Sequence, residues 1–430
     1  MIKKEIIIKR LGRLPDRLKE IVFLARDLAK QEGMGVYLVG GFVRDLILGV
    51  DNFDLDFVVE KNGIDFAHKL SELLKGHMIK HRAFNTATIT TKDGFKIDVA
   101  TSRSEVYPEP AALPVVSVSD IGDDLYRRDF TINALACHID KDRYGEIVDM
   151  FNGAKDLKTG SVRVMHGKSF IDDPTRIIRA VRFEQRLGFQ IDRDTLSLIK
   201  AAKKLKMLEK VQKHRIRDEI ILIFKEKNAF KILRRINQIY NLTFIEDTIK
   251  LNKKHGVNFK KIDKGVIWFR ENLSQKRGLD TWLMYLVIFL YQLDIKRLNH
   301  FVKTYAFPKG DSNRIISFKK VFKKIDKVLS KRNIPVTKLH KLLDPLAYEV
   351  IVLVYSISNS TATKDKIKEF FFEHHHKKLL INGRDLLLIG VKPGPEFRNI
   401  FNKVFKAKIQ GKVVTYQEEL ELVKKLINKK

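Results

Sequence analysis

The 430-residue sequence has a single cysteine, Cys137, which excludes a disulfide bond within the chain. This scarcity is typical of proteins in a reducing compartment, so we expect a cytoplasmic location and a small, buried Cys137. No stretch reaches the roughly 18 to 20 uninterrupted apolar residues that a membrane span needs. The first residues, MIKKEIIIKRLGRLPD, have neither a long apolar core nor a small-residue cleavage site, which disfavours a secretion signal.

Acidic residues are few relative to basic ones. Lysine and arginine number 83 against 52 aspartates and glutamates, which gives a formal net charge of +31. Such an excess favours a polyanionic partner, because each phosphate that a protein neutralises releases bound counterions. Solvated helix faces in a lysine-rich chain are the alternative explanation. The hydrophobic fraction of 44% is large enough for several domains with cores of their own.

The expected secondary structure changes along the chain. Up to about residue 160, short β-type runs mix with helices, with strands at 36–41 and 55–60 and a hairpin formed by TATITT and KIDVATS. After about residue 170 the pattern is helical nearly to the end, as in DPTRIIRAVRFEQRLGF, which ends at Gly188. The sequence therefore predicts an α+β fold, with a mixed β-sheet domain first and helical domains after it.

Two carboxylates stand at the start of the second expected strand. Asp54 and Asp56 are two residues apart, so both side chains point to one face of the sheet. Like charges so close repel each other without a cation, and Mg²⁺ prefers oxygen ligands. Asp98, on the following hairpin, could add a third carboxylate or could be a strand-end acid without metal. Such a layout suits nucleotidyl transfer, in which metal ions activate a 3′-hydroxyl and steady the departing pyrophosphate.

A glycine pair precedes these carboxylates. Gly40 and Gly41 end the first expected strand, and a helix is expected from about Phe42. Glycines let the backbone approach a phosphate, and a helix N-terminus offers free N–H groups to it. Arg44 is placed to reach a triphosphate. Either motif alone is weak, but the order strand, glycine pair, helix and paired aspartates is specific.

Three segments together resemble one family. GGFVRDLILGVDNFDLDFVV resembles the head motif of class II tRNA nucleotidyltransferases (CCA-adding enzymes) and bacterial poly(A) polymerases. RRDFTINALA, from Arg127, resembles their second motif, which senses ribose and phosphates. DDPTRIIRAVRF resembles the base-reading motif, which usually reads Glu-Asp-x-x-Arg. Here the first acid is Asp172, one methylene shorter, so no catalytic role is carried onto it.

The resemblance implies a domain order and a set of nucleotide contacts. The expected order is a nucleotidyltransferase head at 1–160, a base-recognising neck at 161–225, an RNA-binding helical body at 226–380 and a tRNA-binding helical tail at 381–430. Asp54 and Asp56 would bind Mg²⁺, with Asp98 as a further catalytic candidate. Nucleotide contacts would come from Gly40, Gly41, Arg44, Arg128, Asp129, Asn133, Asp173, Arg176, Arg179 and Arg182.

The base-reading pair has an alternative interpretation. Asp173 and Arg176 would bond to the base of CTP or ATP, since a carboxylate only accepts and a guanidinium only donates hydrogen bonds. Asp173 before Pro174 also fits the N-cap of a helix. Arginines 176, 179 and 182 drift by about 60° per step around a helix, so they cannot all contact one nucleotide equally. Arg182 is the one that most readily takes a structural role instead.

The predicted function is template-independent addition or repair of the 3′-terminal CCA of tRNA from CTP and ATP with Mg²⁺. The basic body and tail would hold the tRNA acceptor arm through phosphates and shape, and no protein partner can be inferred. Addition of the terminal A alone, or less readily a poly(A) polymerase, is the alternative. The segment from Ser102 stands where the family has its flexible loop and is not obviously shortened, which disfavours CC addition. A non-catalytic RNA-binding protein would be expected to lack Asp54 or Asp56.

Overall fold

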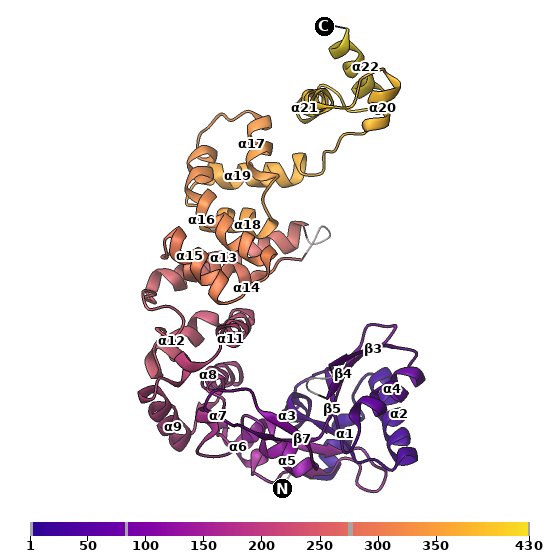
Figure 1. Ribbon diagram of the computed structural model, residues 1–430, viewed down its shortest axis with the longest axis vertical. Coiled ribbons are helices and arrows are strands. Elements are labelled where there is room, and N and C mark those ends of the chain that lie inside the picture. Colours follow the sequence, from indigo (N-terminus) through magenta and orange to yellow (C-terminus); the bar gives the residue numbers. More distant parts are fainter. Residues whose placement is uncertain (1–2, 82–84, 274–277, 429–430) are drawn as a thin grey trace. The chain divides into compact units, whose positions relative to one another are not determined.

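The computed structural model describes residues 3–81, 85–273 and 278–428. The chain divides into two compact units (Figure 1), the first made of Met1–Glu219 with Glu226–Asp247 and the second of Ile220–Lys225 with Thr248–Lys430. The finer division into head, neck, body and tail stays a prediction. Among the described residues, no helix is long and apolar enough to cross a membrane.

A seven-stranded mixed sheet forms the core of the first unit, as the sequence predicts. Its strand order is β3-β4-β5-β2-β1-β8-β9. Neighbouring strands are antiparallel except β2 and β5, which run parallel. The strands are β1 (Val36–Val39), β2 (Leu55–Val59), β3 (His77–His81), β4 (Thr86–Thr90), β5 (Lys96–Thr101), β8 (Ala136–His138) and β9 (Ile147–Val148). β4 and β5 form the predicted hairpin.

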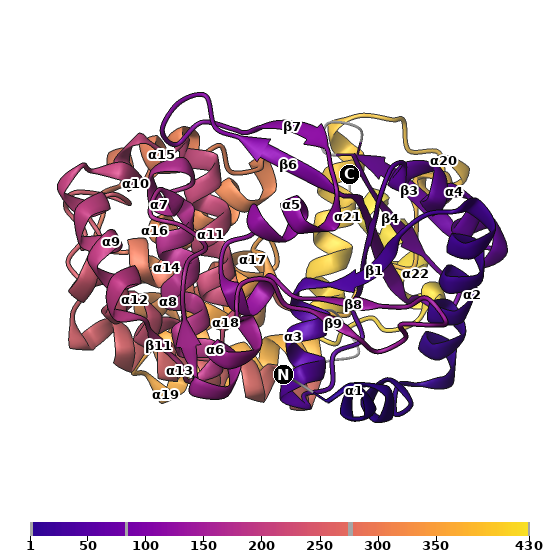
Figure 2. The same ribbon diagram turned by 90° about the horizontal axis from the view of Figure 1, so that it is seen from below.

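Helices and short strands complete the first unit. They are α1 (Lys4–Leu11), α2 (Asp16–Glu32), α3 (Gly40–Leu48), α4 (Gly63–Leu73), β6 (Arg103–Val106), β7 (Val115–Val118), α5 (Ile121–Tyr126), η2 (Thr131–Asn133), α6 (Gly153–Thr159), β10 (Ser161–Val162), α7 (Ser169–Asp172), α8 (Thr175–Leu187), β11 (Gln190–Ile191), α9 (Arg193–Lys204), α10 (Met207–Lys210) and α12 (Ala229–Ile239). Helix α11 (Lys213–Lys225) belongs to both units. β6 and β7 pair as a separate two-stranded ribbon (Figure 2).

Glycines decide two helix boundaries that matter for the site. Helix α3 begins at Gly40, two residues before the predicted start, and Gly40 has a φ of +65° that a side chain would strain. Helix α8 ends at Leu187, where Gly188 takes the left-handed conformation with φ of +71°. This is the helix end that the sequence predicts.

The second unit is helical throughout its described residues. Its core includes the nearly all-apolar helices α14 (Thr281–Leu290) and α18 (Tyr348–Ile357), which pack with α13 (Lys253–Leu273). The others are α15 (Ile295–Thr304), α16 (Lys309–Leu329), α17 (Val336–Leu343), α19 (Thr361–Glu369), the π-helix η3 (Phe370–His374), α20 (Gly383–Leu388), α21 (Pro395–Ile409) and α22 (Tyr416–Ile427). The last three helices share an apolar cluster that includes Leu386, Val404 and Val423. The helical prediction for this part of the chain is confirmed.

Candidate active site

A cleft of about 510 Å³ in the first unit collects nearly all of the predicted site residues. It is lined by residues of α3, of the segment that enters β2, of the stretch between α5 and η2, and of α8. The predicted residues on its wall are Gly40, Gly41, Arg44, Asp54, Asp56, Arg128, Asp129, Asn133, Asp173, Arg176 and Arg179. Asp98 and Arg182 do not line it.

The carboxylates at the cleft repel one another. Asp56 lies on β2 directly opposite Asp98 on β5. Burial, the charge of Asp98 and the charge of Asp54 raise the pKa of Asp56 to about 6, against the opposing effect of Arg128. A cation beside Asp56 would relieve this repulsion. The Asp54 backbone N–H is held by Asn52, which donates in turn from Nδ2 to Asp45.

The donor set of this cluster fits a hard divalent ion, although the three aspartates are not drawn tightly together. Carboxylate oxygens are the ligands that Mg²⁺ prefers. Asp98 accepts a hydrogen bond from Thr88 at 2.6 Å, so one of its oxygens is occupied. Within the part of the chain that the structure describes, the group of three ligand residues whose atoms all lie within 4.8 Å is a different one, Glu369, Glu373 and His374 in the second unit. Asp54 and Asp56 are thus the stronger metal candidates in the cleft.

Arg44 is held rigidly at the start of the cleft. It is 4% exposed and binds both oxygens of Asp45 at 2.8 and 2.9 Å, while its third nitrogen donates to Asn133 at 2.8 Å. Asp45 was not among the predicted residues, although an acid directly after Arg44 in the sequence could have suggested the ion pair. The pairing means that Arg44 is preorganised beside the N-terminus of α3, where a triphosphate would meet free backbone N–H groups.

Asp129 and Asn133 connect α3 with α8. Asn133 accepts from Arg44 and donates to Asp129, and the other oxygen of Asp129 accepts two hydrogen bonds from Arg179 at 2.9 and 2.6 Å. Burial alone would raise the pKa of Asp129, but Arg179 and Asn133 outweigh it and hold that pKa below its usual value. These two residues therefore position the arginines around the cleft through a continuous hydrogen-bond network.

Asp173 and Arg176, the pair predicted to read the base, are anchored by contacts that leave part of each side chain available. Asp173 Oδ1 accepts hydrogen bonds from the backbone and hydroxyl of Thr175 and from Arg215, whereas Oδ2 has no partner among the described residues. Arg176 donates one bond to Ser169 and one to the carbonyl of Arg127, both at 2.7 Å. The predicted N-cap position of Asp173 is one residue early, because Pro174 is the N-cap of α8, although the bond from the Thr175 N–H to Asp173 still resembles helix capping. Asp173 therefore combines this contact with a place on the wall of the cleft.

The stripe of α8 that faces the cleft differs from the predicted one. It consists of Arg176, Arg179, Phe183 and Arg186. At 100° per residue, Phe183 lies about 20° and Arg186 about 80° from Arg176 around the axis, whereas Arg182 lies about 120° away. Arg182 is 7% exposed and pairs with Glu219 at 2.5 Å. This placement agrees with the structural role considered for Arg182, and spacing by three and four residues would have identified Arg186.

The segment between β6 and β7 contacts Ile171 and Arg215, and Arg215 in turn binds Asp173. The Ala111 N–H donates to the carbonyl of Ile171, and Arg215 donates both to the Ala111 carbonyl and to Asp173. Tyr107, which lines the cleft, donates its hydroxyl to Glu105. Arg215 lies far from Asp173 in sequence, so no local pattern pointed to this contact.

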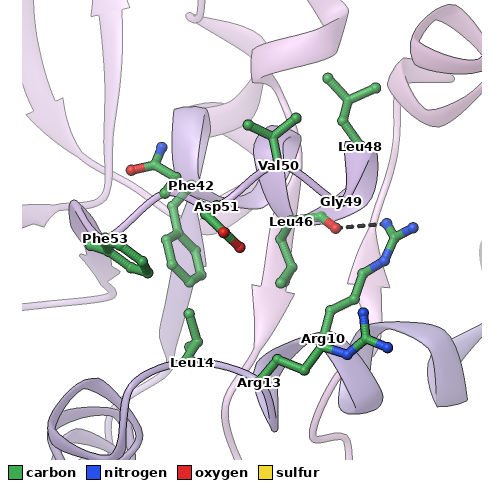
Figure 3. A pocket seen from close by; sticks show the side chains of 11 residues that line it. Arg10, Arg13, Leu14, Phe42, Leu46, Leu48, Gly49, Val50, Asp51 and Phe53 are labelled. Carbon is green, nitrogen blue, oxygen red and sulfur yellow. Dashed lines mark hydrogen bonds between the residues drawn. The ribbon is translucent and has the colours of Figure 1, made fainter.

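A second pocket, of about 250 Å³, is lined by residues 49–53, which lead into Asp54, and by residues of α1 and α3 (Figure 3). Arg10 from α1 donates to the carbonyls of Leu46 and Ile47 and so satisfies the C-terminus of α3. Asn52 lines both this pocket and the cleft. Arg10 therefore anchors the end of α3, after which the chain leads to Asn52 and Asp54.

Asp124 is expected to stabilise the first unit in a pH-dependent way. It is fully buried and binds both Arg127 and Arg128, whose charges overcome the effect of burial and lower its pKa. A folded-state pKa below the unfolded value of about 3.9 contributes stability above that pH and loses it as the pH falls through the folded value. Asp124→Asn should therefore cost about 3 kcal/mol at pH 7 and less below about pH 4.

Urea denaturation at several pH values measures this difference. The control is Asp27→Asn, which removes an exposed ion pair with Arg26 and should cost under about 1 kcal/mol at any pH. An equal loss of stability for Asp124→Asn at pH 3 and pH 7 would contradict the assignment.

Asp54 just before β2, Asp56 on β2 and the glycine-initiated helix α3 are the features of a nucleotidyltransferase head. Residues 36–163 match the poly A polymerase head domain, and residues 188–238 match a probable RNA- and SrmB-binding site of polymerase A. A solved structure described as a CCA-adding enzyme in an apo form is 33% identical, with a TM-score of 0.72 and 98% of each chain covered. The chain belongs to the family of class II CCA-adding enzymes.

Curated relatives in this family include two bacterial proteins. The A-adding tRNA nucleotidyltransferase of Geobacter sulfurreducens is 32% identical over 96% of this chain, which spans 49% of that relative's length. The A-adding tRNA nucleotidyltransferase of Halalkalibacterium halodurans is 28% identical, with 99% of this chain and 93% of the relative covered. Some of these similar proteins are named CCA-adding and others A-adding, and proteins of both names match this chain along nearly all of its length.

Proposed function

We propose that this chain adds nucleotides from CTP and ATP to the 3′ end of tRNA without a nucleic-acid template and so builds or repairs the terminal CCA. The observation that carries the proposal is that Asp173 and Arg176 line the same cleft as Asp54 and Asp56. A base reader and a carboxylate pair in one cleft suit selection and transfer of a single nucleotide.

Protein side chains would replace a template strand in this proposal. The amino groups of cytosine and adenine donate hydrogen bonds, whereas uracil and guanine carry a carbonyl oxygen at the corresponding position. The unpartnered Oδ2 of Asp173 can accept from such an amino group, and the remaining N–H groups of Arg176 can donate to the neighbouring ring nitrogen. The anchored halves of both side chains hold these atoms in position.

Asp54 and Asp56 would hold Mg²⁺, with Asp98 as a further candidate ligand. The chemistry that bound Mg²⁺ supplies is activation of the attacking 3′-hydroxyl and stabilisation of the departing pyrophosphate. Arg44 and the first N–H groups of α3 would bind the triphosphate, while Arg128 and Arg179 would contact sugar and phosphates. Their hydrogen-bond network fixes these positive charges before the nucleotide arrives, which is the arrangement that lowers a phosphoryl-transfer barrier.

Two versions of the activity share this site. Full CCA addition and addition of the terminal A alone both end with transfer of AMP to a tRNA that ends in CC. Names of both kinds occur among the relatives. The test is incubation with tRNA ending before CCA, after C and after CC, each with labelled CTP or ATP. Labelling of the CC-ended tRNA alone identifies A addition, and labelling of none overturns the proposal.

Affinity for tRNA is expected to fall steeply with salt. The net charge of +31 suits several phosphate contacts, and the helical domains would hold the acceptor arm in a cytoplasmic enzyme. Each contact should contribute about −0.7 to −0.9 to the slope of log affinity against log salt concentration. Binding titrations at salt concentrations from about 50 to about 300 mM measure the slope. A flat response would mean that the basic excess is only a solvated surface.

A further inference from the structure

One face of the sheet at β3, β4 and β5 carries no buried side chain among the residues that the structure describes. Helix α4 packs on the opposite face, where residues such as Ala87, Ile89, Ile97 and Val99 are buried. Because side chains alternate along a strand, the intervening residues point away from α4. These residues, none of them buried, are His77, Ile79 and His81 on β3, Thr86, Thr88 and Thr90 on β4, and Lys96 and Asp98 on β5.

This face is continuous with the candidate metal ligands. The strand register pairs Asp56 with Asp98, Asp98 with Thr88, and Thr88 with Ile79. The four residues therefore form a straight row across the sheet, and the hydrogen bond from Thr88 to Asp98 confirms that neighbours in the row face the same side. Three strand spacings of about 4.8 Å put the outer end of the row about 14 Å from Asp56.

The face suits a sugar–phosphate backbone through its hydrogen-bonding groups rather than through net charge, since Lys96 and Asp98 cancel each other. In residues 77–81 and 86–101, the acids are Asp93, which pairs with Arg17, and Asp98, which is bonded to Thr88. Lys96 is exposed, and the side-chain hydroxyls of Thr86 and Thr90 have no partner within the described chain. Ile79, 51% exposed, offers an apolar contact in the same row.

A nucleoside triphosphate in the cleft would leave the side of the carboxylates toward β3 and β4 open. Contacts to a nucleoside triphosphate would come from α3, from residues 127–133 and from α8, and neither β3 nor β4 contributes a residue to the wall of that cleft. A transfer reaction brings two substrates together at Asp54 and Asp56. The strand that carries the attacking hydroxyl must therefore arrive from outside the cleft, and the row from Asp98 to Ile79 leads away from it.

We propose that this face of β3, β4 and β5 binds the last nucleotides of the acceptor strand of the RNA. This inference rests on the proposed function and adds the surface on which its RNA substrate lies. Threonine hydroxyls and Lys96 bind the sugar–phosphate backbone, and Ile79 contacts a sugar or base. At about 3.4 Å per stacked nucleotide, the 14 Å row holds about four nucleotides.

A matched pair of lysine variants tests the role of the face. Lys80, also exposed, pairs across the strands with buried Ala87 and so points to the α4 side. Lys96→Glu should raise KM for a tRNA that ends in CC by about tenfold, with kcat and KM for ATP within about twofold of the unmodified chain. Lys80→Glu makes the same charge change and should alter KM for tRNA by less than about threefold. Equal effects of the two variants, or no effect of either, overturn the proposal.

Crosslinking locates the strand directly and needs no turnover. Because the chain has one cysteine, Cys137, which is buried, a cysteine introduced at position 79 can carry a benzophenone selectively. Ile79→Cys should crosslink within about the last four nucleotides of the tRNA, whereas Lys80→Cys should not. Crosslinks elsewhere in the tRNA, or none from position 79, overturn the proposal. If the unmodified chain adds no nucleotide to any tRNA, the proposed function fails first, and that outcome is distinct from a failed crosslink in an active enzyme.

Discussion

Asp56→Asn is expected to lower the rate of nucleotide addition by at least about a thousandfold while the protein stays folded. The substitution keeps the shape of the side chain but removes the negative charge and one hard oxygen ligand. Because burial and the neighbouring acids raise the pKa of Asp56, loss of this charge relieves repulsion in the free protein. We therefore expect the melting temperature to stay unchanged or to rise. Asp54→Asn should give a comparable loss of activity.

Single-turnover incorporation of labelled AMP into tRNA that ends in CC measures this loss, together with tRNA binding and thermal melting. Asp93→Asn, in the turn before β5, is the control and should keep full activity. Asp98→Asn decides the role of the third carboxylate, since a ligand should lose activity as strongly as Asp56 does. Retention of more than a few per cent of turnover by both Asp54→Asn and Asp56→Asn would show that these aspartates do not hold a catalytic ion.

Asp173→Asn is expected to change which nucleotide is chosen without stopping the chemistry. The amide keeps an oxygen to accept from Thr175 and Arg215, but it places a donor where the unpartnered Oδ2 stood. That donor suits the carbonyl oxygens of uracil and guanine rather than the amino groups of cytosine and adenine. Preference for CTP or ATP over UTP and GTP should fall by about 1 to 3 kcal/mol, roughly 5- to 150-fold.

Helix capping predicts a different result for the same variant. Asparagine is as good an N-cap as aspartate, so a capping role alone would leave both stability and selectivity intact. Asp173→Ala should lower stability by about 1 kcal/mol under either role. Arg176→Ala should relax selection as Asp173→Asn does. Competition among the four nucleotides on one tRNA measures selectivity, and unchanged preference in both variants, with activity retained, would remove the base-reading role.

The local sequence pattern was sufficient to predict the strand, the glycine pair and the helix that precede Asp56. Asp54 and Asp56 both line the cleft, as alternation along a strand predicts, although β2 begins only at Leu55. β4 and β5 form the predicted hairpin. The helix start at Gly40 was predicted two residues late, because the strand pattern continues into glycines that the backbone uses for helix. Errors of this size arise where no side chain marks the boundary.

The partners of the site residues could not be predicted from spacing. Arg215 reaches Asp173, and Glu219 takes Arg182 out of the cleft, through contacts between α11 and residues about forty positions earlier. These pairings depend on which elements the core brings together, and a single sequence does not report that. Asp124 is the exception, because Arg127 and Arg128 follow it by three and four residues, a spacing that would have suggested both ion pairs.

The sequence by itself determined the groups that this protein can offer: two carboxylates two residues apart, a glycine pair at a helix start, and an acid and a guanidinium near the start of another helix. Each of these depends on residues within one strand or helix, where covalent spacing and backbone periodicity decide which side chains lie together. Only the tertiary structure decided which side chains remain available to a ligand. Within the described residues, Asp173 keeps one oxygen unpartnered, Arg182 pairs with Glu219, and Thr88 donates to Asp98. These outcomes follow from competition among charged and polar groups that packing brings together, because a buried charge such as that of Arg182 takes a partner within its reach.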